Sequence, residues 1–490
     1  MQHEPNQSPE TGRTPHWALS IIPFAVLIAI LVCVIRFFGA DALGGGSQLA
    51  LLIAAGVAAA IAMTVCRVPW KQIEEAVVEN IRTVASAIII LLLIGAIAGS
   101  WMVSGVVPML IYYGLKVLSP VIFLFAVCII CALVSVMTGS SWTTIATIGV
   151  ALVGIGLALG FSPGWTAGAI ISGAYFGDKI SPLSDTTVLA SSSCETPLFT
   201  HIRYMFITTV PSFSIACIVF LLVSIFHPKG DAVQVAEFSQ AISSTFRITP
   251  WLFVVPLLTA VMIAKKMPAL QTLFLSALLA GVTALIAQPE IVAQIGAADA
   301  PSTDGFGRMF RGLMITFYGS TSVDTGSEAL NELVQTRGIN GMLSTVYLVL
   351  CAATFGGVLR GTGMIQSITS ALTRRITGRT SLVGTTVATG LMANMVTGDQ
   401  FLSIILTSSL FKKLYQDKGY ENRLLSRTTE DSVTVTSVLI PWNSCGMTQS
   451  TVLKVPTVDY LPYCIFNILS PLMSIIVAAI GYKIVVSVKK

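Results

Sequence analysis

The sequence predicts an all-α polytopic membrane protein, built from two inverted repeats of five transmembrane helices plus a re-entrant hairpin each, with interrupted helices at the midplane. Charged residues make up only 10% of the 490 residues, against about 25% in an ordinary soluble domain. Hydrophobic residues make up 54%, mean hydropathy is +0.83, and the apolar residues come in long runs. A soluble protein of this length needs a charged surface, so the composition excludes soluble enzymes, nucleic-acid-binding proteins and disordered scaffolds.

Eight apolar segments predict transmembrane helices, because roughly 20 apolar residues are needed to cross the hydrocarbon. The first, from about Trp17 to Phe38, is too long for the core of a secretory signal and has no small-residue cleavage site behind it. It is therefore predicted to remain as the first helix. The eight segments are 17–38, 48–66, 83–103, 200–226, 250–264 (a short one), 268–287, 340–359 and 460–482.

Four further apolar segments are interrupted by Gly, Pro, Ser and Asp residues. Non-helical backbone inside a membrane is tolerated only where protein buries it or a water-filled cavity reaches it. Four such breaks in one chain therefore indicate a transport pathway. The segments are 119–160, broken at 137–141; 164–195, broken at 177–185; 381–411, broken at 396–400; and 429–453, broken at 441–446.

Lysine and arginine residues orient the predicted spans, since they concentrate in cytoplasmic loops. If 119–160 and 381–411 are re-entrant hairpins and the N-terminus is cytoplasmic, 20 of the 28 basic residues fall on the cytoplasmic side. The chain then crosses a cell (inner) membrane ten times, with both termini inside. The predicted parts are a cytoplasmic tail 1–16, a first inverted repeat 17–226, an extracytoplasmic linker 227–248, a second inverted repeat 249–484 and a cytoplasmic tail 485–490.

A weak internal repeat links the two halves at one constant offset of 259 residues. Each half crosses the membrane five times in this orientation, and an odd number of crossings inverts the second copy. Inverted repeats with interrupted helices are typical of secondary transporters, which bind substrate where the breaks converge. The matching pairs are Thr138 with Thr397, Pro182 with Pro441, Pro197 with Pro456, and Tyr204 with Tyr463.

Acidic residues occupy the breaks, although each costs about 2.5–3.5 kcal/mol in the membrane and so needs a reason to be there. Asp178, Asp185 and Asp399 lie in breaks, and Glu430 and Asp431 are predicted to open the last broken helix. Asp399 is the strongest functional candidate, and a specific structural alternative is open for each of the others. Asp178 could form a helix-end ion pair with its neighbour in sequence, Asp185 could be an N-cap, and the last two could complement a helix N-terminus.

Hydroxyl groups correspond to the carboxylates at the 259-residue offset. Asp399 corresponds to Ser140, Asp185 to Ser444 and Asp178 to Ser437. Carboxylates, hydroxyls and unwound carbonyls together suit a small hard cation such as Na⁺. The predicted cation and proton site comprises Asp399, Asp185, Asp178, Asp431, Glu430, Ser140, Thr138, Ser184, Thr397, Asn443 and Ser444, with Na⁺ at Asp399, Asp185, Ser140 and Asn443.

Carboxylates in such a site also bind protons, because burial favours their neutral form and a bound cation favours their charged form. Sodium and protons would then compete for the same oxygens, and a protein that moves only when loaded would exchange them. The sequence has no phosphate-binding loop for ATP. No cofactor is expected besides the transported ions. The Cys128–Cys131 pair is interpreted as small apolar packing residues, because its flanks are wholly apolar.

The break motifs closely resemble those of the NhaC family of sodium/proton antiporters. The resemblance rests on Gly177-Asp-Lys-Ile-Ser-Pro-Leu-Ser-Asp-Thr-Thr187, Thr200-His-Ile-Arg-Tyr204, Thr397-Gly-Asp-Gln400, Glu430-Asp-Ser432 and Ser437-Val-Leu-Ile-Pro-Trp-Asn443. It implies sodium/proton exchange, two inverted repeats with re-entrant hairpins, elevator movement and a homodimer in the lipid bilayer. Some family members instead couple sodium and protons to malate and lactate.

Three other functions remain open from the residues. Sodium-coupled exchange of organic anions would need a basic contact, for which Lys179, Arg203 and Arg360 are available near predicted cytoplasmic ends. An intramembrane aspartyl protease would need two membrane aspartates, one of them in a Gly-x-Gly-Asp motif. The Gly-Asp pairs at Asp178 and Asp399 each lack the first glycine. A channel would not need proton-binding carboxylates. No nucleic-acid partner is expected.

Overall fold

In a computed structural model, the described residues are 15–38, 45–227, 232–265, 267–298, 304–373 and 376–484. This part of the chain is helical apart from its connections and one isolated antiparallel bridge between Thr321 and Thr336. Eight of its helices are long and apolar enough to cross a membrane, or up to ten if each of two bent helix pairs is one span. The predicted all-α polytopic class is therefore confirmed. The predicted tail 485–490 and nearly all of the tail 1–16 lie outside the described residues.

The uninterrupted helices match the predicted apolar segments to within a few residues, with one exception. The segment predicted at 83–103 is the apolar end of a longer helix that begins at Trp70, because its polar first half is rich in good helix formers. These helices are α1 (Trp17–Phe38), α2 (Gly46–Thr64), α3 (Trp70–Val103), α10 (Leu198–Phe226), α12 (Val254–Ala264), α13 (Ala269–Ala287), α17 (Leu343–Gly361) and α24 (Ile465–Ile480).

Four interrupted helices lie where the sequence predicts them, and two of them contain π-helical turns, labelled η3 and η6. Such turns are rare and frequently mark functional sites. The interrupted helices are α5 (Phe123–Thr138) with α6 (Ser141–Thr144), η3 (Ile145–Gly149) and α7 (Val150–Ala158); α8 (Pro163–Ile180) with α9 (Asp185–Ser193); α19 (Arg379–Thr397) with α20 (Gln400–Asp417); and α21 (Asn422–Thr429) with η6 (Glu430–Thr434), η7 (Ser437–Leu439) and α22 (Ser444–Leu453).

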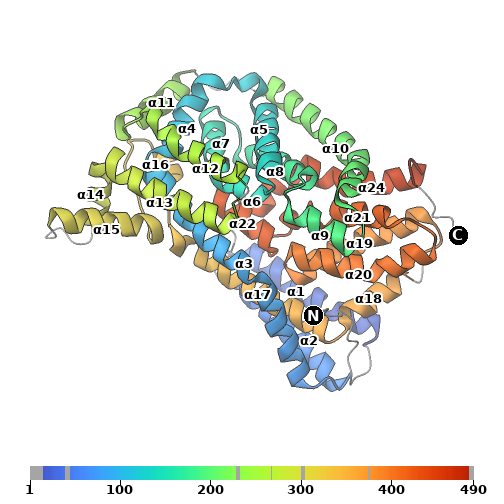
Figure 1. Ribbon diagram of the computed structural model, residues 1–490. Coiled ribbons are helices and arrows are strands. Elements are labelled where there is room, and N and C mark those ends of the chain that lie inside the picture. The colour runs from blue at the N-terminus through green and yellow to red at the C-terminus, as the bar shows by residue number, and fades with distance from the viewer. Residues whose placement is uncertain are drawn as a thin grey trace.

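Several shorter helices were not predicted, because they are amphipathic or too short to span a membrane. The polar stretch 227–248 contains one of them, α11. In Figure 1, α14 and α15 lie at the left of the molecule, α11 lies at the upper left, α2 lies at the bottom, and the interrupted helices fill the centre and the right-hand side. The additional helices are α4 (Val106–Val117), α11 (Ala232–Thr245), α14 (Pro289–Ala297), α15 (Gly305–Tyr318), α16 (Glu328–Val334), α18 (Met364–Thr373) and α23 (Thr457–Tyr460).

Glycines bring the principal helix pairs into close contact, as is common in membranes. A Cβ on Gly173 of α8 would lie 2.1 Å from the carbonyl oxygen of Cys128 in α5. A Cβ on Gly357 of α17 would lie 2.6 Å from the Cα of Val77 in α3, and α3 and α17 run side by side in Figure 1. Cys128 and Cys131 are free thiols within an apolar cluster, as expected for packing residues. These contacts fix α8, which carries much of the candidate site.

Candidate functional site

The first hairpin tip, between α5 and α6, is a tight turn held by hydroxyl groups. Gly139 has a φ of 66°, a conformation that favours glycine. The Thr138 hydroxyl donates to the Ser140 carbonyl (3.2 Å) and accepts from the Ser140 amide (3.2 Å). Ser140 then caps α6, because its Oγ accepts from the amide of Thr143. The turn therefore satisfies the backbone that the break frees from the helix.

The second hairpin tip, between α19 and α20, repeats this turn 259 residues later. Gly398 has a φ of 64°. The Thr397 hydroxyl donates to the Asp399 carbonyl (2.9 Å) and accepts from the Asp399 amide (3.2 Å). Asp399 caps α20 by accepting from the amide of Leu402 (2.9 Å). The difference between the tips is chemical, since a carboxylate stands here where the first tip has a hydroxyl.

Asp178 lies in the last turn of α8 and accepts three hydrogen bonds from residues in the first half of the chain. Its Oδ2 accepts from the amide (3.2 Å) and hydroxyl (2.7 Å) of Ser141, and its Oδ1 accepts from the hydroxyl of Ser184 (2.6 Å). The side chain of Lys179 is directed elsewhere, so the alternative of an ion pair between these two neighbours is wrong. Three donors stabilise the charged form of this carboxylate in a largely buried position.

A cavity of about 550 Å³ reaches Asp178 between the two hairpins. Residues from the first tip, the α8–α9 break and the beginning of α20 line it, together with α3 and the connection between α12 and α13. Ser184, and not Asp185, caps α9, which leaves the Asp185 side chain at the cavity wall. The polar residues used below are Ser140, Asp178, Asp185, Thr186 and Gln400.

Asp399 lies beside this cavity, where Gln400 and Phe401 form the wall. Its Oδ2 accepts a hydrogen bond from the hydroxyl of Ser444 (3.3 Å), the first residue of α22. The Ser444 amide donates to the carbonyl of Gly398 (2.7 Å), so α22 is docked directly on the second tip. Asp399 thus contacts a hydroxyl group, and this hydroxyl comes from the neighbouring break, whereas Ser140, its counterpart at the 259-residue offset, lies in the first tip.

Asn443 holds the two broken helices of the second half together. Its Oδ1 accepts from the amide of Cys445 (3.0 Å), which caps α22, and its Nδ2 donates to the carbonyl of Asn394 (3.1 Å) in α19. The Asn394 side chain in turn donates to the carbonyl of Val433 (2.7 Å) in η6. Both side chains are fully buried. The proposed four-residue sodium set is therefore divided, with Ser140 and Asp185 at the cavity and Asp399 and Asn443 behind it.

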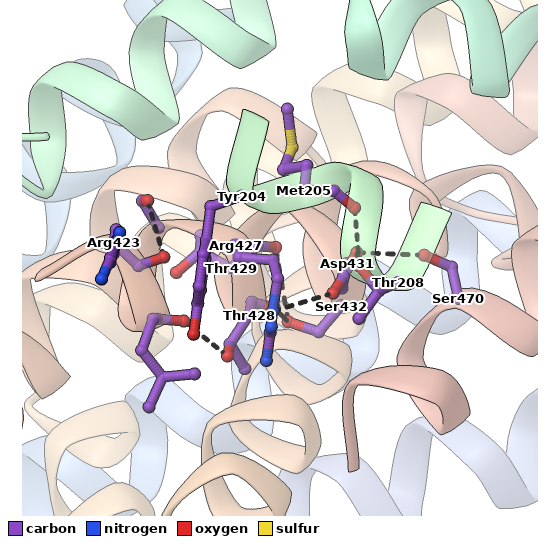
Figure 2. Close-up of polar contacts among 12 residues, drawn as sticks. Tyr204, Met205, Thr208, Arg423, Arg427, Thr428, Thr429, Asp431, Ser432 and Ser470 are labelled. Atoms are coloured by element: carbon purple, nitrogen blue, oxygen red, sulfur yellow. Dashed lines mark hydrogen bonds and ion pairs between the residues drawn. The ribbon is translucent and has the colours of Figure 1, made fainter. Parts of the chain in front are cut away.

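A separate charged cluster lies behind α8 and is fully buried. Lys179 forms an ion pair with Asp431, and both side chains are 0% exposed. Oδ1 of Asp431 also accepts hydrogen bonds from Thr208 (3.1 Å) and Ser470 (3.2 Å), as Figure 2 shows. Arg427 lies one turn before Asp431, with its Nε 3.8 Å from Oδ2. Lys179 lies in the last turn of α8, at a helix end as expected, but its side chain is buried in the interior.

Glu430 and Asp431 do not open the last broken helix, contrary to the sequence prediction. That helix begins at Asn422, and the two acidic residues lie inside it, in the π-helical turn η6. The explanation as complements to a helix N-terminus is wrong for the same reason. Hydropathy did not detect α21 because its residues are mostly polar. Arg427 and Asp431 are four residues apart, a spacing at which opposite charges stabilise a helix. This spacing was the sequence signal from which a helix start before Glu430 could have been predicted.

The comparisons with known proteins cover nearly the whole chain. A model described as the Na⁺/H⁺ antiporter family matches residues 10–193 and 173–482. The Na⁺/H⁺ antiporter NhaC of Alkalihalophilus pseudofirmus is 37% identical over 85% of this chain and 86% of its own. The malate-2H⁺/Na⁺-lactate antiporter of Bacillus subtilis is 35% identical, over 80% and 81%. The arginine/ornithine antiporter ArcD of Halobacterium salinarum is 31% identical, over 96% and 93%.

Proposed function

The chain belongs to the Na⁺/H⁺ antiporter family, as its break motifs predict, and we propose that it exchanges sodium ions for protons across the membrane by alternating access. One observation carries the proposal most directly. A buried carboxylate, Asp178, closes the inner end of a cavity between two hairpins and is held by three donors. A hydrated cation entering this cavity meets a fixed anionic oxygen at a helix break, as in transporters with discontinuous helices.

The cation ligands are proposed to be the carboxylates and hydroxyls at the cavity wall. Asp178 and Asp185 supply anionic oxygens, and Ser140 and Thr186 supply neutral ones. Asp399 and its partner Ser444 lie behind the wall and complete the negative field. Sodium and protons compete for these oxygens, so that a carboxylate loaded with one ion releases the other.

Alternating access is supported by the symmetry of the two tips and by the position of the cavity. The same turn recurs at the 259-residue offset, which is the local signature expected of two repeats. The cavity wall includes residues 267–269, which the basic-residue distribution places on the cytoplasmic side. The conformation described here is therefore proposed to face the cytoplasm, with both chain termini on that side of a cell membrane. The homodimer implied by the family resemblance belongs to the same proposal.

Reconstitution into liposomes that contain a pH dye tests this function. A sodium pulse should change the internal pH for the unmodified protein, and Asp178→Asn and Asp399→Asn should abolish the change. Asp324→Asn, in the loop before α16, is the matched control and should behave like the unmodified protein, because this exposed carboxylate lies outside the cavity. Normal exchange by Asp178→Asn, or no response of the unmodified protein to sodium, would contradict the proposal.

A second candidate function is sodium- and proton-coupled exchange of organic anions. It is favoured by the similarity to the malate-2H⁺/Na⁺-lactate antiporter and by two cationic side chains, Lys179 and Arg427, in the interior. Addition of labelled malate or lactate to the same liposomes distinguishes the two functions. Sodium-driven uptake of either anion would establish the second function, whereas a pH response with no anion uptake supports simple exchange.

A further inference from the structure

A line of charged residues leads from the surface of the protein to the buried Lys179–Asp431 pair. Arg423, Arg427 and Asp431 follow one another at intervals of four residues, so they share one face of α21 and η6. Arg423 is 30% exposed, and Arg427 and Asp431 are 0% exposed. Figure 2 shows Arg427 between the ring of Tyr204 and the carboxylate of Asp431. None of these residues lines the cation cavity.

Several polar atoms along this line lack hydrogen-bond partners within the part of the chain that the structure describes, although Arg427 lies 3.8 Å from Asp431 as an ion pair and 4.7 Å from the centre of the Tyr204 ring. The three guanidinium nitrogens of Arg427 donate no hydrogen bond, and Oδ2 of Asp431 accepts none. His201 contacts Ser426 through Nδ1 (2.9 Å), while its buried Nε2 has no partner. Ser474, one turn beyond the serine of α24 that contacts Asp431, has an equally unpaired buried hydroxyl.

Unpaired groups of this kind are costly in a membrane protein. A buried hydroxyl or amide without a partner costs roughly 2–7 kcal/mol, and a charged group costs more. Folded proteins leave few such atoms and commonly satisfy them with buried water. A water needs two to four polar partners, and Arg427, Asp431, His201 and Ser474 offer donors and acceptors in one region. Hydration is therefore the arrangement that makes this interior physically acceptable.

We propose that a chain of water molecules runs along α21 and η6 from Arg423 to Asp431, and that it serves as a proton route separate from the sodium cavity. This proposal rests on the sodium/proton exchange proposed above. The two routes reach neighbouring residues of one helix, because the water chain ends at the ion pair of Lys179 and the cavity ends at Asp178. The cations Arg427 and Lys179 repel sodium from the narrow route. A proton can still leave along the water chain, because its charge passes from one water to the next by rearrangement of hydrogen bonds. This outward movement of a proton is equivalent to inward movement of a hydroxide ion, which the two cations attract.

Hydroxyl-radical labelling of the unmodified protein, read by mass spectrometry, tests the hydration. Radicals are generated from water, so buried side chains react only where water lies beside them. His201 and Trp101 are 0% and 1% exposed, but Trp101 lies in an apolar cluster with its Nε1 bonded to Ser276 (3.0 Å). Tryptophan is the more reactive side chain, yet His201 should be oxidised at least ten-fold faster. Equal or slower oxidation of His201 would overturn the water chain.

Two fluxes measured on Arg427→Leu test the role of the route. Sodium-driven proton movement should fall at least ten-fold, whereas exchange of labelled for unlabelled sodium, which needs no proton, should stay within two-fold. Arg427→Lys, which keeps a charged donor, should restore much of the proton movement. Unchanged proton movement in Arg427→Leu, or loss of sodium counterflow together with it, would overturn the proposal. If the unmodified protein moved no protons with sodium, the proposed function would fail, and the labelling result would still decide the hydration.

Discussion

Replacing Asp431 by Asn is expected to destabilise the protein strongly, because this carboxylate is the anion on which the buried cluster depends. One of its oxygens accepts from Lys179, Thr208 and Ser470, and the other faces Arg427 at 3.8 Å from Nε. Asn keeps the shape of the side chain and removes its charge. Both cations would then lose their ion-pair partner while they stay buried, and breaking a buried pair in this way typically costs about 3–5 kcal/mol.

The double variant Lys179→Met with Asp431→Leu separates the charge effect from the loss of packing. Apolar replacement of both partners of a buried pair is often close to neutral. The double variant leaves Arg427 without its partner, whereas Asp431→Asn leaves both Lys179 and Arg427 without theirs, so the double variant should be the more stable of the two. The coupling between the two positions is the effect of the double variant minus the summed effects of Lys179→Met and Asp431→Leu made singly. The free energy of unfolding would be measured by tryptophan fluorescence of the purified protein in a titration from mild detergent into sodium dodecyl sulfate.

A surface pair provides the matched control for this measurement. Lys71 and Glu75 lie 4.0 Å apart on α3 with side chains that are 86% and 69% exposed. Such pairs contribute little to stability, so Glu75→Gln should unfold like the unmodified protein. The reasoning is refuted if Asp431→Asn costs no more than Glu75→Gln, or if the double variant loses the full sum of its two single variants.

Three other changes have equally specific outcomes. Ser141→Ala removes a 2.7 Å hydrogen bond to Asp178, and since bonds to charged groups contribute about 1.5–3 kcal/mol, the KM for sodium in liposomes should rise about ten-fold or more. Gly398→Ala places a Cβ on a residue in the left-handed conformation, which costs about 1–2 kcal/mol, so both the thermal midpoint of unfolding and the transport rate should fall. Gly384→Ala is the control and should change neither, because a Cβ at Gly384 meets open space. Lys454→Met removes the ammonium group that donates to three carbonyls around the end of α16. Hydrogen exchange of the backbone amides in α16 should therefore become faster. Unchanged exchange would show that other contacts hold this helix.

The helix breaks could be predicted from sequence because they are local. The turn at Gly139, its counterpart at Gly398 and the prolines of the other two breaks follow from residues next to one another in the chain. Long apolar helices were predicted for the same reason. Polar helices such as α21, and the polar first half of α3, were missed because a search for apolar runs cannot detect a helix that is stabilised by its packing and not by its composition.

The side-chain partners of the site could be predicted only in part. The 259-residue offset relates Asp178 to Ser437, and the structure gives them equivalent contacts: Asp178 accepts from Ser141, and Ser437 donates to Gln400, the counterpart of Ser141 (3.4 Å). The ion pair of Lys179 lies outside such reasoning, because its partner is 252 residues away and unrelated to it by the offset.

The shared turn of the two hairpin tips has a consequence for how such a protein can change over evolutionary time. A hydroxyl at Ser140 and a carboxylate at Asp399 cap their helices with the same geometry, so the backbone does not depend on which of them is present. The charge of each tip is therefore free to vary without a new fold. Single substitutions at these two positions could therefore move a negative charge from one half of the chain to the other while every helix stays in place.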